Sequence, residues 1–370
     1  MPFQRSRLVA LVAAAALVAS ACSTGAGSSP IPAPSSPPAA SGASTQPPGS
    51  SSAAPSATPL PATATVRLAL DWTPNTNHTG FYVAQQNGWY RDQAIDPKII
   101  PYTSSSPETL VSAGSAECGI STQEGATFAI AAGAKERSVM AILQHTATEI
   151  AVRDDGKILR PRDLDGKLYA GFGTPQEAPE LQTVIRYDGG KGVFRTATLE
   201  TAAYEALYAG KADFTITFSA WEAIEAQERG VKLKTFNFTD YGLPDSYAVV
   251  LVCNDSWLAN DGDVARRFLA ATVKGFELAA SDPDTAAALL LKANPGVFDA
   301  NQKLPLDSAR YLAQRMLYVD ATGAVGQQTL AEWSGLSGLF ARDGLLAGPD
   351  GKPLKATPDF STYFTNDFLP

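Results

Sequence analysis

The chain has 370 residues and a formal net charge of −8, with 45% hydrophobic and 18% charged residues. This composition is usual for soluble globular domains, and the chain is longer than one compact core usually serves, so we expect two lobes. The negative charge makes nucleic acid and an anionic membrane surface poor candidates as partners.

The first 22 residues have the pattern of an export signal. Arg5 and Arg7 precede an apolar run from Leu8 to Ala19, and small residues then lead to Cys22. Such a pattern is typical of a secretory signal, and the run is shorter than the about 20 residues that span a bilayer. We interpret residues 1–21 as a signal peptide and Cys22 as a lipidation site. The alternative is an ordinary signal peptide in which Cys22 has no role.

Residues 22–65 read as a tether. After the cysteine they are Ser, Pro, Ala and Gly almost throughout, and they carry no charge. Too few large apolar side chains are present to offset the entropy of ordering, so we expect this segment to be disordered. We therefore expect an exported protein at the outer face of the cell membrane, held there by lipid alone.

Beyond the tether, predicted strands alternate with predicted helices. The first stretch comprises strand 66–70, helix 80–87, strand 98–100, helix 107–113, strand 118–121 and helix 124–132. The second comprises strand 167–172, helices 176–186 and 202–207, strand 214–216, helix 219–228 and strands 231–236 and 247–253. Helices 263–280, 284–291, 306–316 and 326–339 follow. Alternation at this spacing indicates an α/β fold with parallel strands.

The restart of the alternation defines the expected lobes. We assign residues 66–153 and 248–370 to lobe 1 and residues 154–247 to lobe 2, with crossings within 138–153 and 245–253. In open α/β sheets ligands bind beyond the carboxyl ends of the strands. In a two-lobe protein these ends face one another across a cleft, which closes around the ligand by a hinge motion.

Polar and aromatic residues follow four of the predicted strands. Tryptophans offer flat faces for stacking, amides and carboxylates offer hydrogen bonds, and small residues let backbone N–H groups approach a ligand. Each residue alone fits a structural role, such as a helix cap, equally well, and the coincidence of four such loops favours a site. The candidate ligand-binding residues are Trp72, Asn77, His78, Gln123, Glu124, Gly173, Thr174, Glu177 and Trp221. None of the four loops contains Lys or Arg, which favours a neutral heterocycle over a small anion such as an alkanesulfonate.

The cysteines and histidines predict no metal or catalytic centre. Cys118 and Cys253 lie in predicted strands, where an exported protein permits a disulfide and buried free thiols are equally compatible. The two histidines, His78 and His145, accompany neither a cysteine cluster nor a nucleophile elbow. We therefore expect no metal and no cofactor.

The segment from Asp71 to Gly80, followed by Tyr82-Val83-Ala84-Gln85 and Gly88-Trp89-Tyr90, resembles the opening signature of the thiamine-pyrimidine-synthase-like substrate-binding proteins. The similarity continues to Phe364–Pro370 and covers essentially all of residues 66–370. The resemblance implies a two-lobe type II periplasmic-binding fold and ABC permease and ATPase subunits as partners. It also implies that the ligand is a flat nitrogen heterocycle, either an aminopyrimidine precursor of thiamine or riboflavin.

The resemblance extends to fungal enzymes that consume their own histidine and a bound pyridoxal phosphate, with iron held near a cysteine-rich motif. His78 occupies the matching histidine position, and Gly171–Thr174 resembles the place where those enzymes hold the phosphate. This chain has no cysteine-rich motif and carries an export signal. We therefore interpret it as a binding protein, with His78 as a ligand-contacting or loop-ordering residue; an enzyme of this type is the alternative.

Overall fold

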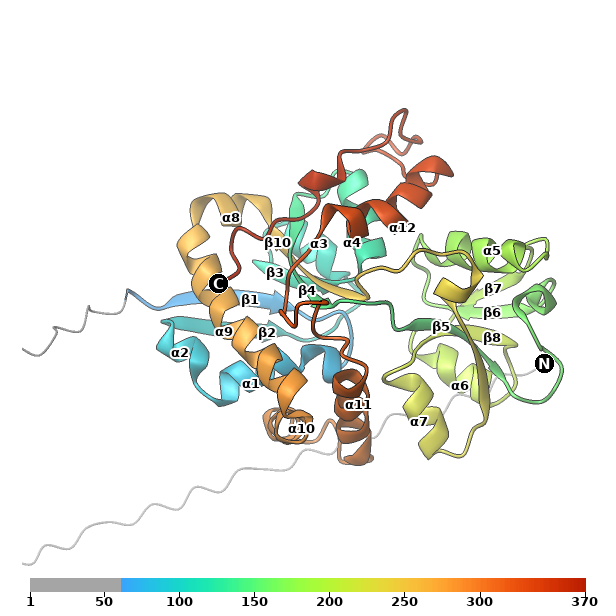
Figure 1. The fold of residues 1–370 in the computed structure, drawn as a ribbon, viewed down its shortest axis with the longest axis horizontal. Coiled ribbons are helices and arrows are strands. Elements are labelled where there is room, and N and C mark those ends of the chain that lie inside the picture. Colours follow the sequence, from blue (N-terminus) through green and yellow to red (C-terminus); the bar gives the residue numbers. More distant parts are fainter. Residues whose placement is uncertain (1–60) are drawn as a thin grey trace, which may run out of the picture. The chain divides into compact units, whose positions relative to one another are not determined.

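Two five-stranded sheets, each with helices packed on it, form the two lobes of the protein (Figure 1). The structure is a computed structural model that describes residues 61–370. The expected two-lobe α/β fold is confirmed. The predicted signal peptide, the lipidation of Cys22 and nearly all of the tether lie outside the described residues. The first strand begins at Ala64, so the last two residues assigned to the tether already belong to a sheet.

Lobe 1 is built on a sheet with the strand order β2-β1-β3-β10-β4. Strand β1 pairs in parallel with β2 and β3, whereas β10 runs antiparallel to β3 and β4 because it enters from the other lobe. Its strands are β1 (Ala64–Ala69), β2 (Ile95–Ile100), β3 (Cys118–Ser121), β4 (Glu136–Leu143) and β10 (Val249–Asn254). Its helices are η1 (Thr76–His78), α1 (Thr79–Gln86), α2 (Trp89–Asp92), α3 (Pro107–Ser112), α4 (Gln123–Ala131), α8 (Asp255–Asn260), α9 (Gly262–Ser281), α10 (Pro283–Ala293), α11 (Lys303–Gln314), α12 (Leu330–Arg342) and η4 (Phe360–Thr362).

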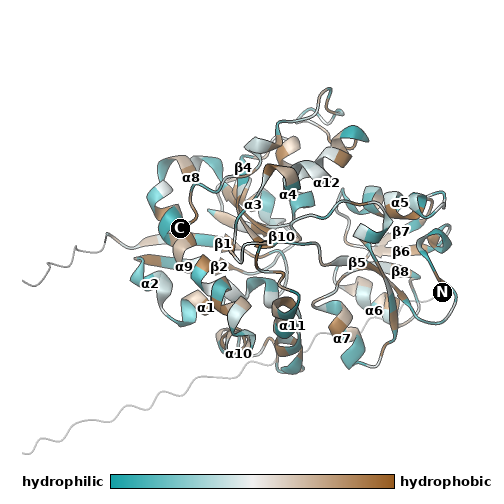
Figure 2. Ribbon diagram, viewed as in Figure 1, coloured by the Kyte–Doolittle hydropathy of each residue, from teal (hydrophilic) through white to brown (hydrophobic). Residues whose placement is uncertain are grey.

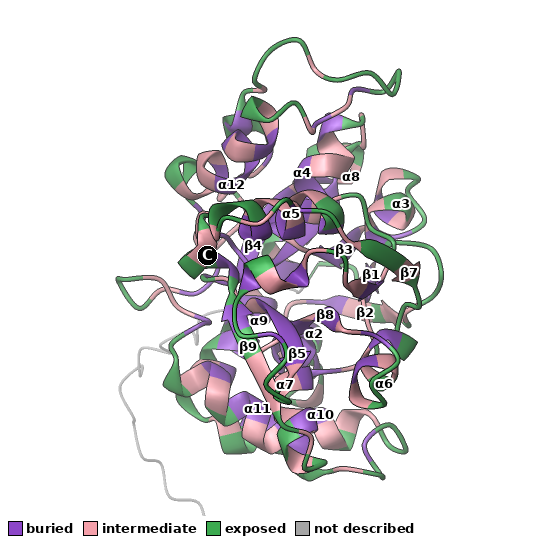
Figure 3. Ribbon diagram, turned by 90° about the vertical axis from the view of Figure 1, so that its right-hand side faces the viewer, coloured by how far each residue is buried: buried purple, intermediate pink, exposed green. Residues whose placement is uncertain are grey.

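Lobe 2 is built on a sheet with the strand order β7-β6-β8-β5-β9. Its strands are β5 (Thr148–Arg153), β6 (Leu168–Gly171), β7 (Arg195–Thr198), β8 (Phe214–Phe218) and β9 (Leu233–Asn237). Its helices are η2 (Pro161–Leu164), α5 (Glu177–Tyr187), α6 (Ala202–Tyr208), α7 (Glu222–Glu228) and η3 (Phe238–Tyr241). The edge strand β7 is largely exposed, which Figure 3 shows in green, whereas most residues of the inner strands β5, β6 and β8 are buried.

The chain passes from the first sheet to the second between β4 and β5 and returns between η3 and β10. The sequence-based boundary at Arg153 placed β5 in lobe 1, and for this strand the boundary is wrong. Strand β5 pairs antiparallel with both β8 and β9, so its backbone hydrogen bonds belong to the second sheet. We therefore propose that lobe 2 begins after the turn at residues 144–147.

Apolar strands and a close helix crossing hold lobe 1 together. Figure 2 shows hydrophobic residues along the strands and hydrophilic residues on the outer helix surfaces. Helix α1 crosses α9 where two glycines meet: a Cβ on Gly275 would lie 2.0 Å from the carbonyl oxygen of Gly80. No larger residue fits there, and this crossing fixes the position of α1, whose start carries the loop that follows β1.

Cys118 of β3 and Cys253 of β10 form a disulfide, which settles the pairing that the sequence left open. The two cysteines lie directly opposite one another on antiparallel strands. Because 135 positions separate them, the disulfide closes a loop that contains the whole of lobe 2.

Candidate functional site

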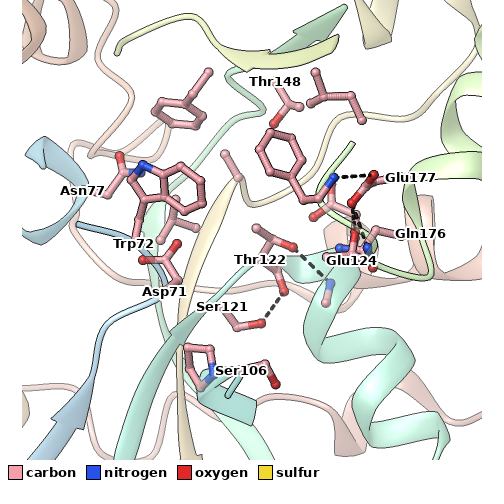
Figure 4. Close-up of a pocket in the computed structure, with 18 of the residues that line it drawn as sticks. Asp71, Trp72, Asn77, Ser106, Ser121, Thr122, Glu124, Thr148, Gln176 and Glu177 are labelled. Carbon is pink, nitrogen blue, oxygen red and sulfur yellow. Dashed lines mark hydrogen bonds between the residues drawn. The ribbon is translucent and has the colours of Figure 1, made fainter. Parts of the chain in front are cut away.

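A cavity of about 420 Å³ lies between residues of the two lobes, a size typical of small-molecule sites. It is lined by the segments that follow β1, β2 and β3 in lobe 1 and β6 and β8 in lobe 2. Figure 4 shows Trp72 and Asn77 approaching from one side and Gln176 and Glu177 from the other. The predicted position at the carboxyl ends of the strands therefore coincides with the cavity.

The loop after β1 is ordered by His78. Its Nδ1 accepts the N–H of Asn75 at 3.3 Å, so the proton is on Nε2, which donates to Asp71 Oδ1 at 2.8 Å. The Asn75 side chain in turn accepts the N–H of Asn77 and caps η1. His78 is fully buried and does not line the cavity. Of the two roles expected for this histidine, the structure contains the loop-ordering one, because both ring nitrogens already have partners.

This ordering leaves Trp72 and Asn77 directed at the cavity. The ring centroid of Trp72 lies 5.4 Å from that of Tyr102 in lobe 1, and 5.9 and 6.4 Å from those of Phe172 and Tyr204 in lobe 2. Four aromatic rings from both lobes therefore form one wall. Asn77 is 8% exposed and lines the cavity, and its Oδ1 has no hydrogen-bond partner within residues 61–370.

Gln123 and Glu124 occupy neighbouring positions at the start of α4 but face different surroundings. Gln123 is fully buried away from the cavity: its Nε2 donates to the carbonyl of Glu332 at 3.1 Å, and its Oε1 accepts the N–H of Tyr247 at 3.0 Å. Its predicted ligand contact is therefore absent, because its amide joins α4 to α12 and to the returning chain. Glu124 lines the cavity, and burial raises the pKa of its carboxyl group.

Glu177 holds the loop after β6 in the shape that faces the cavity. Its Oε1 accepts the N–H and the hydroxyl of Thr174 at 2.8 and 2.7 Å, and its Oε2 accepts the N–H of Phe172 at 3.0 Å and the hydroxyl of Tyr169 at 2.9 Å. Gly171 has to be glycine, since a Cβ there would lie 2.5 Å from the Glu177 carboxylate. Of the two backbone N–H groups expected to face a ligand, those of Gly173 and Thr174, the one of Thr174 therefore already donates to an internal carboxylate.

The same loop contains two further candidate residues, Gly173 and Thr174. Thr174 lines the cavity and Gly173 does not. Gly173 is exposed and has a φ of +88°, so its role is to allow the turn. In the loop that resembles a phosphate-holding one, Gly171–Thr174, two of the backbone N–H groups, those of Phe172 and Thr174, donate to Glu177.

The segment after β8 supplies Trp221 and Glu222. Trp221 lines the cavity and packs edge-on against Phe298 of lobe 1, with ring centroids 6.2 Å apart. Glu222, which the sequence did not single out as a site residue, is 5% exposed and accepts the N–H of Phe218 at 3.1 Å. Burial raises the pKa of Glu222 to about 7. Its place directly after a predicted strand-end tryptophan was the signal that could have identified it.

The cavity is acidic. Seven carboxyl side chains line it, and the described residues of its lining include no Lys, Arg or His. They are Asp71, Glu108, Glu124, Glu177, Glu180, Glu200 and Glu222. Burial and then the charges of Glu124 and Glu177 raise the pKa of Glu180 well above its ordinary value. Such a site can accept hydrogen bonds from a ligand and is poorly suited to an anion.

Three buried polar atoms at the cavity have no hydrogen-bond partner among the described residues. They are Asn77 Oδ1, Glu180 Oε1 and Thr217 Oγ1. An unsatisfied buried polar group costs about 1–3 kcal/mol, so a ligand that supplies partners to these atoms gains affinity from them. Only Asn77 was expected from the sequence; Glu180 lies on α5 and Thr217 within β8.

No helix within residues 61–370 is long and apolar enough to cross a membrane. Within the same residues, no three His, Cys, Asp or Glu side chains lie close enough together to hold a metal ion.

Solved structures share the fold. The alkanesulfonate-binding protein SsuA from Xanthomonas axonopodis pv. citri superposes with a TM-score of 0.62 at 16% sequence identity, over 83% of this chain and 99% of that one. At this identity the likeness concerns the fold alone.

Three curated relatives are similar in sequence over most of their length. The formylaminopyrimidine-binding protein of Halalkalibacterium halodurans is 28% identical over 77% of this chain and 87% of its own. A 4-amino-5-hydroxymethyl-2-methylpyrimidine phosphate synthase of Saccharomyces cerevisiae, THI12, is 23% identical over 83% of this chain and 88% of its own. The riboflavin-binding protein RibY of Chloroflexus aurantiacus is 22% identical over 86% of this chain and 89% of its own.

A family model described as NMT1/THI5 like matches residues 75–286, which is more than half of the chain. The matched region starts in the loop ordered by His78 and includes both sides of the cavity up to α10. The chain belongs to the NMT1/THI5-like family.

Proposed function

We propose that this protein is the extracytoplasmic substrate-binding component of an ABC importer and that it captures a small, flat nitrogen heterocycle rich in hydrogen-bond donors. The observation that supports this most directly is the lining of the cavity: among the described residues, aromatic rings from both lobes accompany seven carboxyl groups and no basic side chain. A thiamine-precursor aminopyrimidine fits this lining, and the relative that binds formylaminopyrimidine supports it.

In the proposed binding mode, the aromatic and the polar residues that line the cavity contact different parts of the ligand. Trp72 and the neighbouring rings contact the faces of the heterocycle, and aromatic pairs add about 0.5–1.5 kcal/mol beyond burial. Asn77 Oδ1, which has no partner among the described residues, accepts a hydrogen bond from one edge of the heterocycle. Glu222 has a pKa of about 7, so its carboxyl group can donate or accept a hydrogen bond. It forms hydrogen bonds with a ring nitrogen of the ligand and with the neighbouring amino group. Closure of the two lobes then excludes water.

Two observations argue against the small-anion alternative. The cavity lacks a basic side chain among its described lining residues. In addition, the N–H groups of Phe172 and Thr174, which could hold an anion, already donate to Glu177. A sulfonate would therefore enter a field of carboxylates without a compensating donor set.

The surroundings of His78 argue against the enzyme alternative. The yeast relatives are named synthases, and the resemblance matches their consumed histidine to His78. Here this side chain is fully buried beneath the cavity, with Asn75 and Asp71 on its two ring nitrogens. Such a residue is held for structure and is not presented to a bound molecule, which supports binding without catalysis.

Export and lipid anchoring complete the proposal. We propose that residues 1–21 direct export and that Cys22 carries the lipid, because the N-terminal pattern fits a bacterial lipoprotein. The disulfide between Cys118 and Cys253 supports an oxidising compartment outside the cytosol.

Riboflavin is a second candidate ligand. A neighbouring cavity of about 870 Å³ shares Ser106, Glu108, Gly125, Thr174 and Gln176 with the first, so the two cavities adjoin each other. RibY, the riboflavin-binding relative, supports the same possibility.

Thermal unfolding of the chain from Ser23 to Pro370 with a ligand panel tests the proposal. The panel contains hydroxymethylpyrimidine, formylaminopyrimidine, thiamine, riboflavin, taurine and pyridoxal phosphate. A ligand at a hundred times its dissociation constant should stabilise by about 2.7 kcal/mol. We expect a shift with the pyrimidines; a shift with riboflavin and quenched flavin fluorescence would favour the second candidate. A shift with taurine alone would contradict the proposal.

A further inference from the structure

Glu124 and Glu180 bring two buried carboxyl groups to the cavity from opposite lobes. Glu124 is the second residue of α4 in lobe 1, and Glu180 lies in the first turn of α5 in lobe 2. They are 9% and 4% exposed, and both line the cavity. In Figure 4, Glu124 and Glu177 lie across the cavity from Trp72.

Neither carboxyl group has a basic partner among the described residues, and Glu180 Oε1 has no hydrogen-bond partner there at all. Glu124 is held by neutral donors only: Oε1 accepts a long hydrogen bond from Ser246 Oγ, at 3.3 Å, and the Thr122 hydroxyl and the N–H of Glu124 itself also donate to its carboxyl group. The charges that act on Glu180 come from Glu124 and Glu177, and both are negative. Glu177 offers no hydrogen bond that would offset this repulsion, because its two oxygens already accept hydrogen bonds from four donors.

Burying two carboxylates together without a counter-charge is costly, so the empty cleft favours a proton on the pair, in agreement with the raised pKa of both groups. A positively charged group between them would take the place of that proton. The described residues around the pair provide no such group, because no Lys, Arg or His lines the cavity. A metal ion is a poor fit, since no cluster of three ligating side chains occurs in residues 61–370.

We infer that Glu124 and Glu180 bind a protonated amine of the ligand, so that the ligand is an aromatic heterocycle with a positively charged side arm. This inference rests on the proposed function and narrows its ligand class. The ring occupies the aromatic wall near Trp72 and Glu222, and the amine reaches the carboxyl pair. Glu222 is a separate acidic position: it begins α7, and its carboxylate accepts the N–H of Phe218.

A matched pair of ligands tests the inference by titration calorimetry on the chain from Ser23 to Pro370 at pH 7. One is 4-amino-5-aminomethyl-2-methylpyrimidine, whose side arm is protonated, and the other is its neutral hydroxymethyl analogue. We expect the amine to bind at least about tenfold more tightly, the size of effect that a charge-assisted hydrogen bond gives. Glu180→Gln should abolish this advantage, so that the affinities of the variant for the two compounds differ by less than about threefold. Glu124→Gln should reduce the advantage in the same direction.

Glu277→Gln is the control, since this exposed residue of α9 changes the net charge equally and does not line the cavity. Equal affinity of the wild-type protein for the two ligands would overturn the inference while the proposed function stands. The wild-type comparison needs no variant, so a poorly folded Glu180→Gln protein would not rescue the inference. Failure of every heterocycle to bind would overturn the proposed function and this inference together.

Discussion

The loops after β1 and β6 face each other across the cavity and are ordered by the same device. In each, one buried ionisable side chain satisfies the backbone of its own loop: His78 in lobe 1 and Glu177 in lobe 2. The outcome differs. The lobe 1 loop leaves Asn77 Oδ1 unpaired, whereas the lobe 2 loop uses its donors internally and presents the ring of Phe172. One loop thus offers polar recognition, and the other offers an apolar face.

Glu177→Ala is expected to have the largest effect on this comparison. The change leaves the N–H groups of Phe172 and Thr174 and the hydroxyl of Tyr169 without their acceptor. We expect a loss of about 3–5 kcal/mol in the free energy of unfolding, measured by urea denaturation, together with weaker ligand binding. Glu277→Ala is the control and should change stability by less than about 0.5 kcal/mol. A loss of similar size in both variants would refute the conclusion that Glu177 orders the loop after β6.

His78→Ala breaks the opposite loop and should cost somewhat less. It removes a fully buried ring and the hydrogen bonds to Asn75 and Asp71, so we expect a loss of about 2–4 kcal/mol in unfolding free energy. The other histidine, His145, has a half-exposed side chain paired with Asp245, and its change to alanine should cost under about 1 kcal/mol. If His78→Ala kept full stability and lost only binding, His78 would be a ligand contact after all.

Trp72→Ala separates binding from stability and should have the smallest effect on folding. Trp72 is only partly buried, so we expect a stability change under about 1 kcal/mol, with a dissociation constant about 10–100-fold higher because the ring wall is lost. Calorimetry with the best ligand of the panel, beside a urea melt of the same preparation, measures both. Unchanged affinity would remove Trp72 from the proposed site.

The sequence predicted the fold and the location of the cavity well, because strand ends and α/β alternation are local patterns. It was less able to say which way a side chain points. Gln123 and Glu124 are adjacent at the start of α4, and about 100° of helical rotation separates their directions. One therefore joins α12 and the other faces the cavity. Only the packed structure distinguishes the two.

Site residues on helices escaped the sequence analysis for a related reason. Glu180 belongs to α5, where an acidic residue between apolar positions looks like an ordinary solvent-facing one. Tyr204 on α6 reaches the aromatic wall only because lobe 2 faces Trp72 of lobe 1. The strand β5 was assigned to the wrong lobe because its pairing with β8 and β9 is not encoded in a local pattern.

The disulfide between Cys118 and Cys253 has a consequence for proteolytic cleavage of lobe 2. Exposed loop tips are the usual sites of nicking. Every peptide bond of lobe 2 lies between the two cysteines, so a single cut there yields fragments that stay covalently joined. Both fragments also supply strands to the sheet of lobe 1. A nicked receptor therefore remains one molecule and keeps its attachment to the N-terminal segment until the disulfide is reduced.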